Sequence, residues 1–499
     1  MRTSTSEPHP TRALLLCLAL CSLLTSAGQD PKRSAAKLTL LVLGKTQLLD
    51  TPHGFPEYCE ENAKSDRLEL RPETIQRLKH IAKNERSALL EALGGAELLT
   101  EFWLVNAMVV RVTPKQAVAL RKNEKLGPIY AAGNLPAKKL SKDVELTELL
   151  KAAKRGPFDT GGKLVPSNLT RLGAPRVWSE LGIHGAGSLI VSMDNGVDYT
   201  HPDLRGAIWI NPHEIAGNGK DDDDNGFVDD IYGYDFRRQS SELINTSERQ
   251  HGTLTSSLMV GDGSAGRITG VAPRASLMLI RADGGPVMAL QAFQYSLEQG
   301  ADVVNMSFSI PNLKQVRGLW RRMAEHATAA GLVLVSGAGN FQRSAEVPVQ
   351  IRIPEGIPCV ISVGGVDEQG LLANASSTGP VEWGSVTTYG DHPMPEGLIK
   401  PDLAAYFGPG LALVRPGSEG GEDGYAPVDN SIRGNSLSAP QVSGTVALML
   451  SANPSLTPWR IKAILEETAK DIAPAGKDTQ TGAGLLDTYA AVQRALELR

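Results

Sequence analysis

The sequence predicts an α/β protein, in which a mostly parallel, doubly wound sheet follows a small α+β unit. Three observations support this prediction. From about residue 166 onward, short apolar segments alternate with amphipathic helical segments, as in a parallel sheet covered on both faces. Residues 37–134 show a separate pattern of strands and helices. The 499 residues, 41% of them apolar and 21% charged, are typical of a globular protein and too many for one ordinary core.

The N-terminus is typical of a secretory signal peptide over residues 1–27. Arg2 and Arg12 supply positive charge, an apolar segment follows at 13–24, and small residues would allow cleavage after Ala27. This segment is too short to span a bilayer comfortably, although an uncleaved anchor is the alternative. We therefore expect a secreted protein, extracellular or periplasmic, without a transmembrane span.

Residues 28–134 are expected to form the small α+β unit. Apolar residues at 38–44 and 102–112 predict strands, and the apolar spacing over 72–93 predicts a helix. A second, shorter helix is expected to begin at Pro114, because proline is favoured at the first helical position.

Residues 135–165 are expected to be a connector between the two parts. The segment carries six basic residues and then three glycines: Lys138, Lys139, Lys142, Lys151, Lys154, Arg155, Gly156, Gly161 and Gly162. We expect processing or flexibility here, and an ordinary solvated surface is the alternative.

The main domain, 166–499, is expected to contain buried strands separated by helices. The strands are predicted at 188–194, 276–282, 302–308, 332–338 and 359–365. Helices are expected after His251, Gly285, Leu313, Ser436 and Pro458. In open parallel sheets the active site lies beyond the carboxyl ends of the strands.

Four segments of this domain carry the chemistry: VSMDNGVDYTHPDL, HGTLTSSLM, VSGAGN and GNSLSAPQVSG. Asp194 and Asn340 each end an apolar strand, whereas His251 and Ser436 each open a helix. A serine hydroxyl is a poor nucleophile until a base removes its proton, and an acid must hold that base in the correct tautomer. Asp194, His251 and Ser436 are therefore the candidate catalytic triad.

Each member of the triad has an alternative in the sequence. Asp198 or Asp203 could be the acid, although only Asp194 directly follows the apolar strand. His53 or His184 could be the base, but only His251 precedes Gly-Thr and a helix of small residues.

In motif and order, Asp then His then Ser, these segments resemble the subtilisin-like serine protease family. Further similarity lies in KPDLAA at 400–405 and GAGLLDTYAAV at 482–492. The resemblance favours Ser436 over Ser438 and implies an oxyanion hole in which Asn340 is the second donor. It also implies a secreted serine endopeptidase acting on proteins or peptides, made as an autoprocessed precursor. Residues 28–134 would then be the prodomain, an intramolecular inhibitor.

The chain departs from the family pattern around the expected substrate pocket. Asn435 replaces the usual Thr, Gln441 replaces a common His, and Phe341 follows the oxyanion Asn. The family's Ser-Leu-Gly-Gly wall is Ser-Phe-Ser-Ile here, at 307–310. Because side chains replace two glycines, we expect a preference for small or medium apolar residues before the cleaved bond.

The acidic segment DDDDNGFVDD at 221–230 predicts a structural calcium site. Gly226 falls sixth, where a calcium loop needs a sharp turn, but Tyr232 takes the twelfth position, so this is no regular EF-hand. A solvated acidic loop is the alternative. The candidate ligands are Asp221, Asp223, Asn225, Asp229 and Asp230.

Charge and cysteine content argue against a nucleic-acid-binding protein and against a disulfide-rich protein. The net charge of −5 gives no support for nucleic-acid binding, which usually needs a basic patch. Cys59 and Cys359 are too few for a disulfide framework, and Cys359 is expected to be buried in an apolar run. A catalytically silent binding protein on the same fold and a serine esterase remain as alternatives.

Overall fold

The computed structural model describes most of the chain outside its N-terminus. The described residues are 37–51, 53–132, 158–244, 251–282, 285–310, 316–381, 398–408, 412–413, 425–426, 433–472 and 474–499. The predicted signal peptide and most of the predicted connector lie outside them. None of the described helices is long and apolar enough to cross a membrane.

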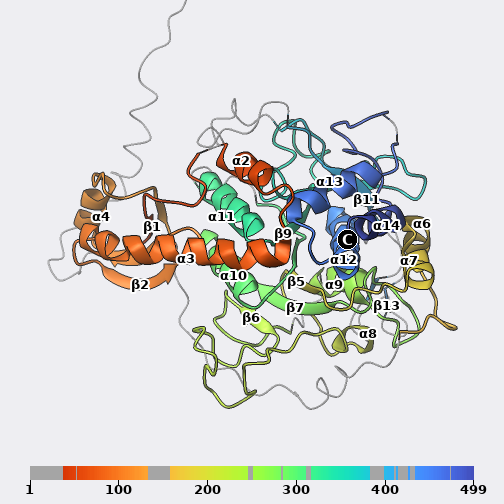
Figure 1. Ribbon diagram of the computed structural model, residues 1–499, viewed down its shortest axis with the longest axis horizontal. Coiled ribbons are helices and arrows are strands. Elements are labelled where there is room, and N and C mark those ends of the chain that lie inside the picture. The colour runs from red at the N-terminus through yellow and green to blue at the C-terminus, as the bar shows by residue number, and fades with distance from the viewer. Residues whose placement is uncertain are drawn as a thin grey trace, which may run out of the picture.

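A seven-stranded sheet forms the centre of the larger domain, with all of its neighbouring strands parallel (Figure 1). This confirms the predicted fold class. In spatial order its strands are β11 (Leu403–Tyr406), β10 (Ile361–Val366), β9 (Val333–Gly337), β8 (Val303–Met306), β5 (Leu189–Met193), β7 (Ser276–Arg281) and β6 (Gly233–Asp235). Five of them match the predicted strands, and the two edge strands, β6 and β11, were not predicted. A two-stranded sheet pairs β12 (Ala412–Leu413) with β13 (Tyr425–Ala426).

Helices cover both faces of the seven-stranded sheet. Alternate side chains of β5 enter different cores, since Ile190 packs with the helices of one face and Val191 with those of the other. The first face carries α6 (Ser167–Leu172), α7 (Ala174–Glu180), α9 (His251–Val260), α12 (Asn435–Ala452), α13 (Pro458–Thr468) and α14 (Thr488–Glu497), with the short α8 (Pro202–Arg205) beside α9. The second face carries α10 (Pro286–Glu298) and α11 (Arg317–Ala329).

The N-terminal unit is a four-stranded antiparallel sheet with helices. Its strands, in spatial order, are β2 (Glu97–Phe102), β3 (Ala107–Val112), β1 (Leu38–Leu43) and β4 (Ile129–Ala131). The predicted strand over 102–112 is therefore two strands, which a turn containing Asn106 at φ 39° separates. The helices are α2 (Gly54–Glu61), α3 (Arg67–Ala92) and α4 (Pro114–Arg121).

The helix predicted from Pro114 is confirmed as α4. Thr113 caps it: its hydroxyl accepts from Gln116 N at 3.3 Å, while Gln116 Oε1 accepts from Thr113 N at 2.9 Å. The other predicted helix, over 72–93, begins earlier than expected. It starts at Arg67, where the Asp66 carboxylate accepts from Leu68 N at 2.7 Å.

The small sheet packs against α10 and α11 of the larger domain. Leu41 and Leu43 of β1 lie in the same core as residues of both helices. His326 of α11 is buried there, and burial lowers its pKa to about 4, so the ring is neutral near pH 7. Its Nδ1 donates to Leu104 O at 2.6 Å and its Nε2 accepts from Leu49 N at 3.3 Å. Both ring nitrogens of this histidine are therefore bonded to the N-terminal unit.

Candidate active site

Asp194 lies at the carboxyl end of β5, and its carboxylate is surrounded by three donors. Asn195 N donates to Oδ1 at 2.7 Å, and Thr255 Oγ1 donates to Oδ2 at 3.1 Å. His251 Nδ1 lies 2.9 Å from both carboxylate oxygens. The side chain is 8% exposed, so these donors replace most of its contact with water.

The alternative acids make different contacts. Asp198 accepts from the Thr200 hydroxyl at 2.6 Å. Asp203 is buried, and it accepts from the Tyr425 hydroxyl and from Ala265 N. Of the three aspartates, Asp194 is the one that the structure brings to His251.

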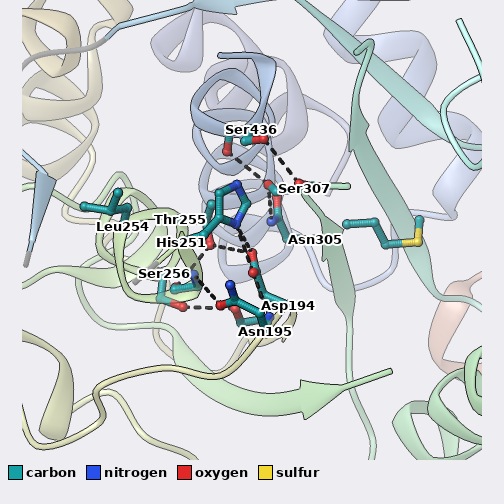
Figure 2. Close-up of polar contacts among 12 residues, drawn as sticks. Asp194, Asn195, His251, Leu254, Thr255, Ser256, Asn305, Ser307 and Ser436 are labelled. Carbon is teal, nitrogen blue, oxygen red and sulfur yellow. Dashed lines mark hydrogen bonds and ion pairs between the residues drawn. The ribbon is translucent and has the colours of Figure 1, made fainter. Parts of the chain in front are cut away.

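His251 is the first residue of α9, and its ring lies between Asp194 and Ser436 (Figure 2). Burial, the largest effect, lowers the pKa of the ring, but the charge and the hydrogen bond of Asp194 outweigh it, so the pKa is raised. With the imidazole 36% exposed, Nε2 can face a substrate while Nδ1 is held by Asp194.

Ser436 is the second residue of α12, a helix buried almost all round at the centre of the domain. In this rotamer Ser436 Oγ donates to Ser307 O at 3.2 Å, and Ser307 Oγ donates to Ser436 O at 3.0 Å (Figure 2). Catalytic hydrogen bonds are often long or unformed without substrate, so this rotamer leaves Ser436 a candidate nucleophile. Ser438, the alternative serine, is fully buried and donates to Tyr406 O at 3.2 Å.

Asn340 follows β9 and is exposed beside the start of α12. Its Oδ1 accepts from Asn435 N at 2.8 Å, which leaves Nδ2 as the atom able to donate to a substrate oxygen. Gly434 leaves room for this amide, because a Cβ there would lie 3.0 Å from Nδ2. The geometry is that of a preorganised donor at a helix N-terminus.

Sequence reasoning missed two supporting groups of this site. Thr255, one turn after His251 on α9, bonds the same carboxylate, and its i,i+4 spacing was the available signal. Asn305 joins Ser307 to Ser443 of α12: its Nδ2 donates to Ser307 Oγ at 2.9 Å and its Oδ1 accepts from Ser443 Oγ at 2.9 Å. No local motif in the sequence indicated this second connection.

A cavity of about 430 Å³ adjoins His251. Its lining is mainly apolar and includes Met193, Phe308, Ile310 and Trp320. The cavity can therefore take an apolar side chain next to the candidate base.

Three departures from the family pattern make specific contacts of their own, and one of them, Ser309, lines this cavity. The Ser309 hydroxyl donates to Glu355, a fully buried carboxyl whose pKa burial raises to about 7. The Arg352 guanidinium lies 3.5 Å from the ring centroid of Phe341. Asn435 Nδ2 donates to Gly339 O at 2.7 Å and to Ser376 Oγ at 3.0 Å, so it connects α12 to the loop after β9.

The acidic loop brings three carboxylates together. Glu214, Asp221 and Asp223 each place one oxygen within 4.8 Å of the others, which suits a hard divalent cation. Glu214 was not predicted. The Asp229 oxygens instead accept from Asn218 N at 3.2 Å and Gly219 N at 3.1 Å.

Two further predicted ligands are bonded to protein groups. Asp230 accepts from Tyr295 OH at 2.6 Å, and burial raises its pKa to about 7. Asn225 Nδ2 donates to Asp223 and Asp230, both at 3.0 Å. Within the described residues, the carboxylates that lie close enough together to share one cation are those of Glu214, Asp221 and Asp223, and they too accept hydrogen bonds from protein groups.

Comparison with known proteins gives similarities over the larger domain. The model of the subtilase family, Peptidase S8, matches residues 185–484. Subtilisin-like protease 1 of Plasmodium berghei (strain Anka) is 25% identical over 316 residues, 62% of this chain and 50% of the relative. Fervidolysin of Fervidobacterium pennivorans is 27% identical over 351 residues, 64% of this chain and 42% of the relative. This chain thus spans about half the length of these two relatives or less.

A third relative, the major intracellular serine protease of Bacillus subtilis (strain 168), is 26% identical over 297 residues, 58% of this chain and 75% of the relative. The crystal structure of fervidolysin, a keratinolytic enzyme related to subtilisin, matches with a TM-score of 0.55 at 21% identity. That match covers 93% of this chain and 62% of the other, and it supports the fold.

Proposed function

The chain belongs to the subtilase family, and from that premise we propose that it is a serine endopeptidase that hydrolyses peptide bonds through Asp194, His251 and Ser436. The observation that carries the proposal is the contact of His251 Nδ1 with both oxygens of Asp194, at 2.9 Å, at the edge where α12 presents Ser436. A digest of a peptide library, with Ser436→Ala as control and an ester substrate alongside, tests it.

In the proposed reaction, Ser436 Oγ attacks the scissile carbonyl while His251 Nε2 takes its proton. Asp194 stabilises the resulting imidazolium, as the raised pKa of His251 requires. Asn340 Nδ2 and the backbone N–H of Ser436 would stabilise the oxyanion at the start of α12. His251 then protonates the leaving amine, and water releases the acyl group by the same steps in reverse.

We propose further that the protein is secreted and is cleaved between its two units. The apolar segment at 13–24 supports secretion, and residues 133–157 connect the N-terminal sheet to the larger domain. The N-terminal unit covers α10 and α11, as an inhibitory prodomain would.

Autoprocessing should create a new N-terminus within about 133–165. Mass spectrometry of the purified protein is expected to find that terminus in the native chain. The Ser436→Ala chain should stay intact, because it lacks the nucleophile. An intact native chain with full peptidase activity, still joined to residues 37–132, would contradict the inhibitory role.

The cavity beside His251 should favour small or medium apolar residues before the cleaved bond. Ile310→Ala would enlarge it, and cleavage after Phe or Leu should rise about tenfold relative to cleavage after Ala. Sequencing of library digests measures the ratio, with the exposed, distant Ile215→Ala as control. A native digest dominated by cuts after Arg, Lys, Phe or Tyr would refute this preference.

A calcium ion should stabilise the loop through Glu214, Asp221 and Asp223. A ligand that binds only the folded state stabilises it by about 2.7 kcal/mol at 100 times its Kd. Thermal melts at millimolar calcium should therefore lie several degrees above melts with chelator. Asp223→Asn should shrink the difference, whereas Asp224→Asn, which removes the same charge outside the cluster, should not. Equal native melts in both conditions would disprove the site.

A further inference from the structure

The segment 351–355 joins the two stretches of chain that follow β8 and β9. Toward the stretch after β8, Ile353 O accepts from Ile310 N at 2.7 Å. Toward the stretch after β9, the guanidinium of Arg352 stacks on the ring of Phe341, with its carbon 3.5 Å from the ring centroid. Because β8 and β9 are parallel neighbours, both stretches leave the same edge of the sheet. The segment therefore bridges them beyond the carboxyl ends of the strands.

The same two stretches carry groups of the candidate active site. Ser307 directly follows β8, and its carbonyl oxygen accepts from Ser436 Oγ at 3.2 Å (Figure 2). Asn340 follows β9 and offers Nδ2 to a substrate oxygen. The carbonyl that Ser436 attacks belongs to the residue before the cleaved bond. Side chains on the amino side of that bond would therefore lie beside both stretches.

Phe341 fixes the guanidinium of Arg352 beside the loop that carries Asn340. The ring packs against Gly339, where an added Cβ would lie 2.8 Å from Phe341 Cδ2. Arg352 Nε also donates to Val349 O at 3.2 Å, so the guanidinium is held both by its face and by its edge. A guanidinium that is already held in place loses little side-chain entropy when it binds an anion.

The two outer nitrogens of this guanidinium have N–H groups left for a ligand. Within the part of the chain that the structure describes, Nη1 and Nη2 of Arg352 make no hydrogen bond or ion pair, and the residue is half-buried. The fully buried Glu355 accepts from Arg352 N at 3.0 Å. Because burial raises the pKa of Glu355 to about 7, its charge offsets that of Arg352 only in part near neutral pH. A fixed, positively charged fork of N–H donors suits a carboxylate.

The wall at 307–310 has two kinds of neighbour. Phe308 and Ile310 pack against the apolar core that lines the cavity beside the candidate base. The hydroxyl of Ser309 instead reaches the buried carboxyl that is bonded to Arg352 N. Consecutive side chains of an extended peptide point to opposite sides. A peptide lying along the wall would therefore place one side chain in the apolar cavity and a neighbouring one near the guanidinium.

We propose that Arg352 binds a carboxylate of the substrate, so that the enzyme favours peptides with an acidic residue at the first or second position before the cleaved bond. The inference rests on the proposed peptidase function and specifies its substrates as peptides that carry an acidic residue next to an apolar one. Two N–H groups of the fork would donate to the two carboxylate oxygens. Arg352 acts in substrate binding, and the steps at Ser436 stay as described.

A peptide-library digest by the native, self-processed protein tests the preference. Sequencing gives the frequency of Glu relative to Gln at each position before the cut, and Gln has the same shape without the charge. At the first or second position Glu should exceed Gln about tenfold. Paired peptides taken from the digest, with Glu or Gln at that position, should show the same ratio in kcat/KM. The ratio should fall in about 0.5 M NaCl, since salt screens a partly exposed ion pair.

Three variants assign the preference to the guanidinium. Arg352→Gln removes the charge and should bring the ratio of Glu to Gln to about one. Arg352→Lys keeps the charge without the fork and should retain roughly a third of the preference. Arg343→Gln is the matched control and should keep the native ratio, since Arg343 is exposed on the same loop and donates to Asn374 O at 3.1 Å. Cleavage of the Gln peptide should stay within about threefold in all three, which verifies an intact site.

Two results would overturn the proposal and leave the peptidase function in place. One is equal cleavage of Glu and Gln peptides by the native protein at both positions. The other is a preference for Glu that persists in Arg352→Gln, or that Arg343→Gln abolishes. A native protein that cleaves no peptide of the library contradicts the peptidase function itself, and the inference then fails with it.

Discussion

Ser436→Ala is expected to slow peptide cleavage by about 10⁶-fold while the fold is retained. Removal of the catalytic serine from a subtilisin has an effect of this size, because the nucleophile and its base act as a unit. Ser436 Oγ makes one hydrogen bond, to Ser307 O, so its loss removes little from the structure. Turnover of a fluorogenic peptide and labelling by a fluorophosphonate probe measure the effect, and both should vanish.

Ser438→Ala is the matched control, two residues further along α12. Its hydroxyl is buried and bonded to Tyr406 O, so its loss should lower stability slightly and leave turnover within about tenfold. Near-native turnover in Ser436→Ala, or loss of labelling only in Ser438→Ala, would show that the nucleophile is assigned wrongly. Retained structure with no activity in the native chain would favour a silent binding protein.

The central strands could be predicted because they are buried on both faces. Such strands are continuous apolar runs, as in LIVSM of β5 and VLVSG of β9, and the β-branched Val and Ile in them favour a strand over a buried helix. The edge strands β6 and β11 escaped prediction because they are short. Their segments GYD and LAAY are three and four residues long, and short edge strands carry little periodic signal.

The start of α3 was missed because the prediction rested on the apolar spacing from Pro72 onward, whereas the helix begins at Arg67. The better signal was Asp66 followed by Glu69, the spacing of a helix cap. Pro72 lacks a backbone N–H, so the helix loses one hydrogen bond there. Tertiary packing compensates for this loss, because Arg67 and Leu70 in the first turns of α3 are buried. Propensity alone could not indicate this, because the packing partner lies more than 200 residues away in the chain.

The residues of the candidate triad could be predicted from the sequence, but their contacts could not. Motif order indicated Asp194, His251 and Ser436, whereas the rotamer of Ser436 and the bond of Thr255 to Asp194 depend on packing. In the acidic loop, too, a contact that depends on the fold was not predicted. Glu214 joins the cluster because its carboxylate accepts from Asp222 N at 2.8 Å, a turn contact between residues eight apart.

Asp194→Asn is expected to slow peptide cleavage by about 10⁴-fold without unfolding the protein. Replacing the triad aspartate with asparagine in another serine protease has an effect of this size. An asparagine amide presents N–H toward His251, so Nδ1 must accept instead of donate. Nε2 then carries the proton and can no longer act as a base. The remaining oxygen can still accept from Asn195 N or Thr255, which should preserve the loop.

The pH dependence of peptidase activity distinguishes a catalytic role of Asp194 from a structural one. In the native enzyme the charge of Asp194 raises the pKa of His251, and activity should fall as the pH drops through that value. In Asp194→Asn that pKa should be lower, so the remaining activity should persist to more acidic pH. Asp198→Asn, a nearby buried aspartate bonded to Thr200, should retain both the native profile and turnover within about tenfold. An Asp194→Asn variant with native turnover, or with an unshifted profile, would remove Asp194 from the triad.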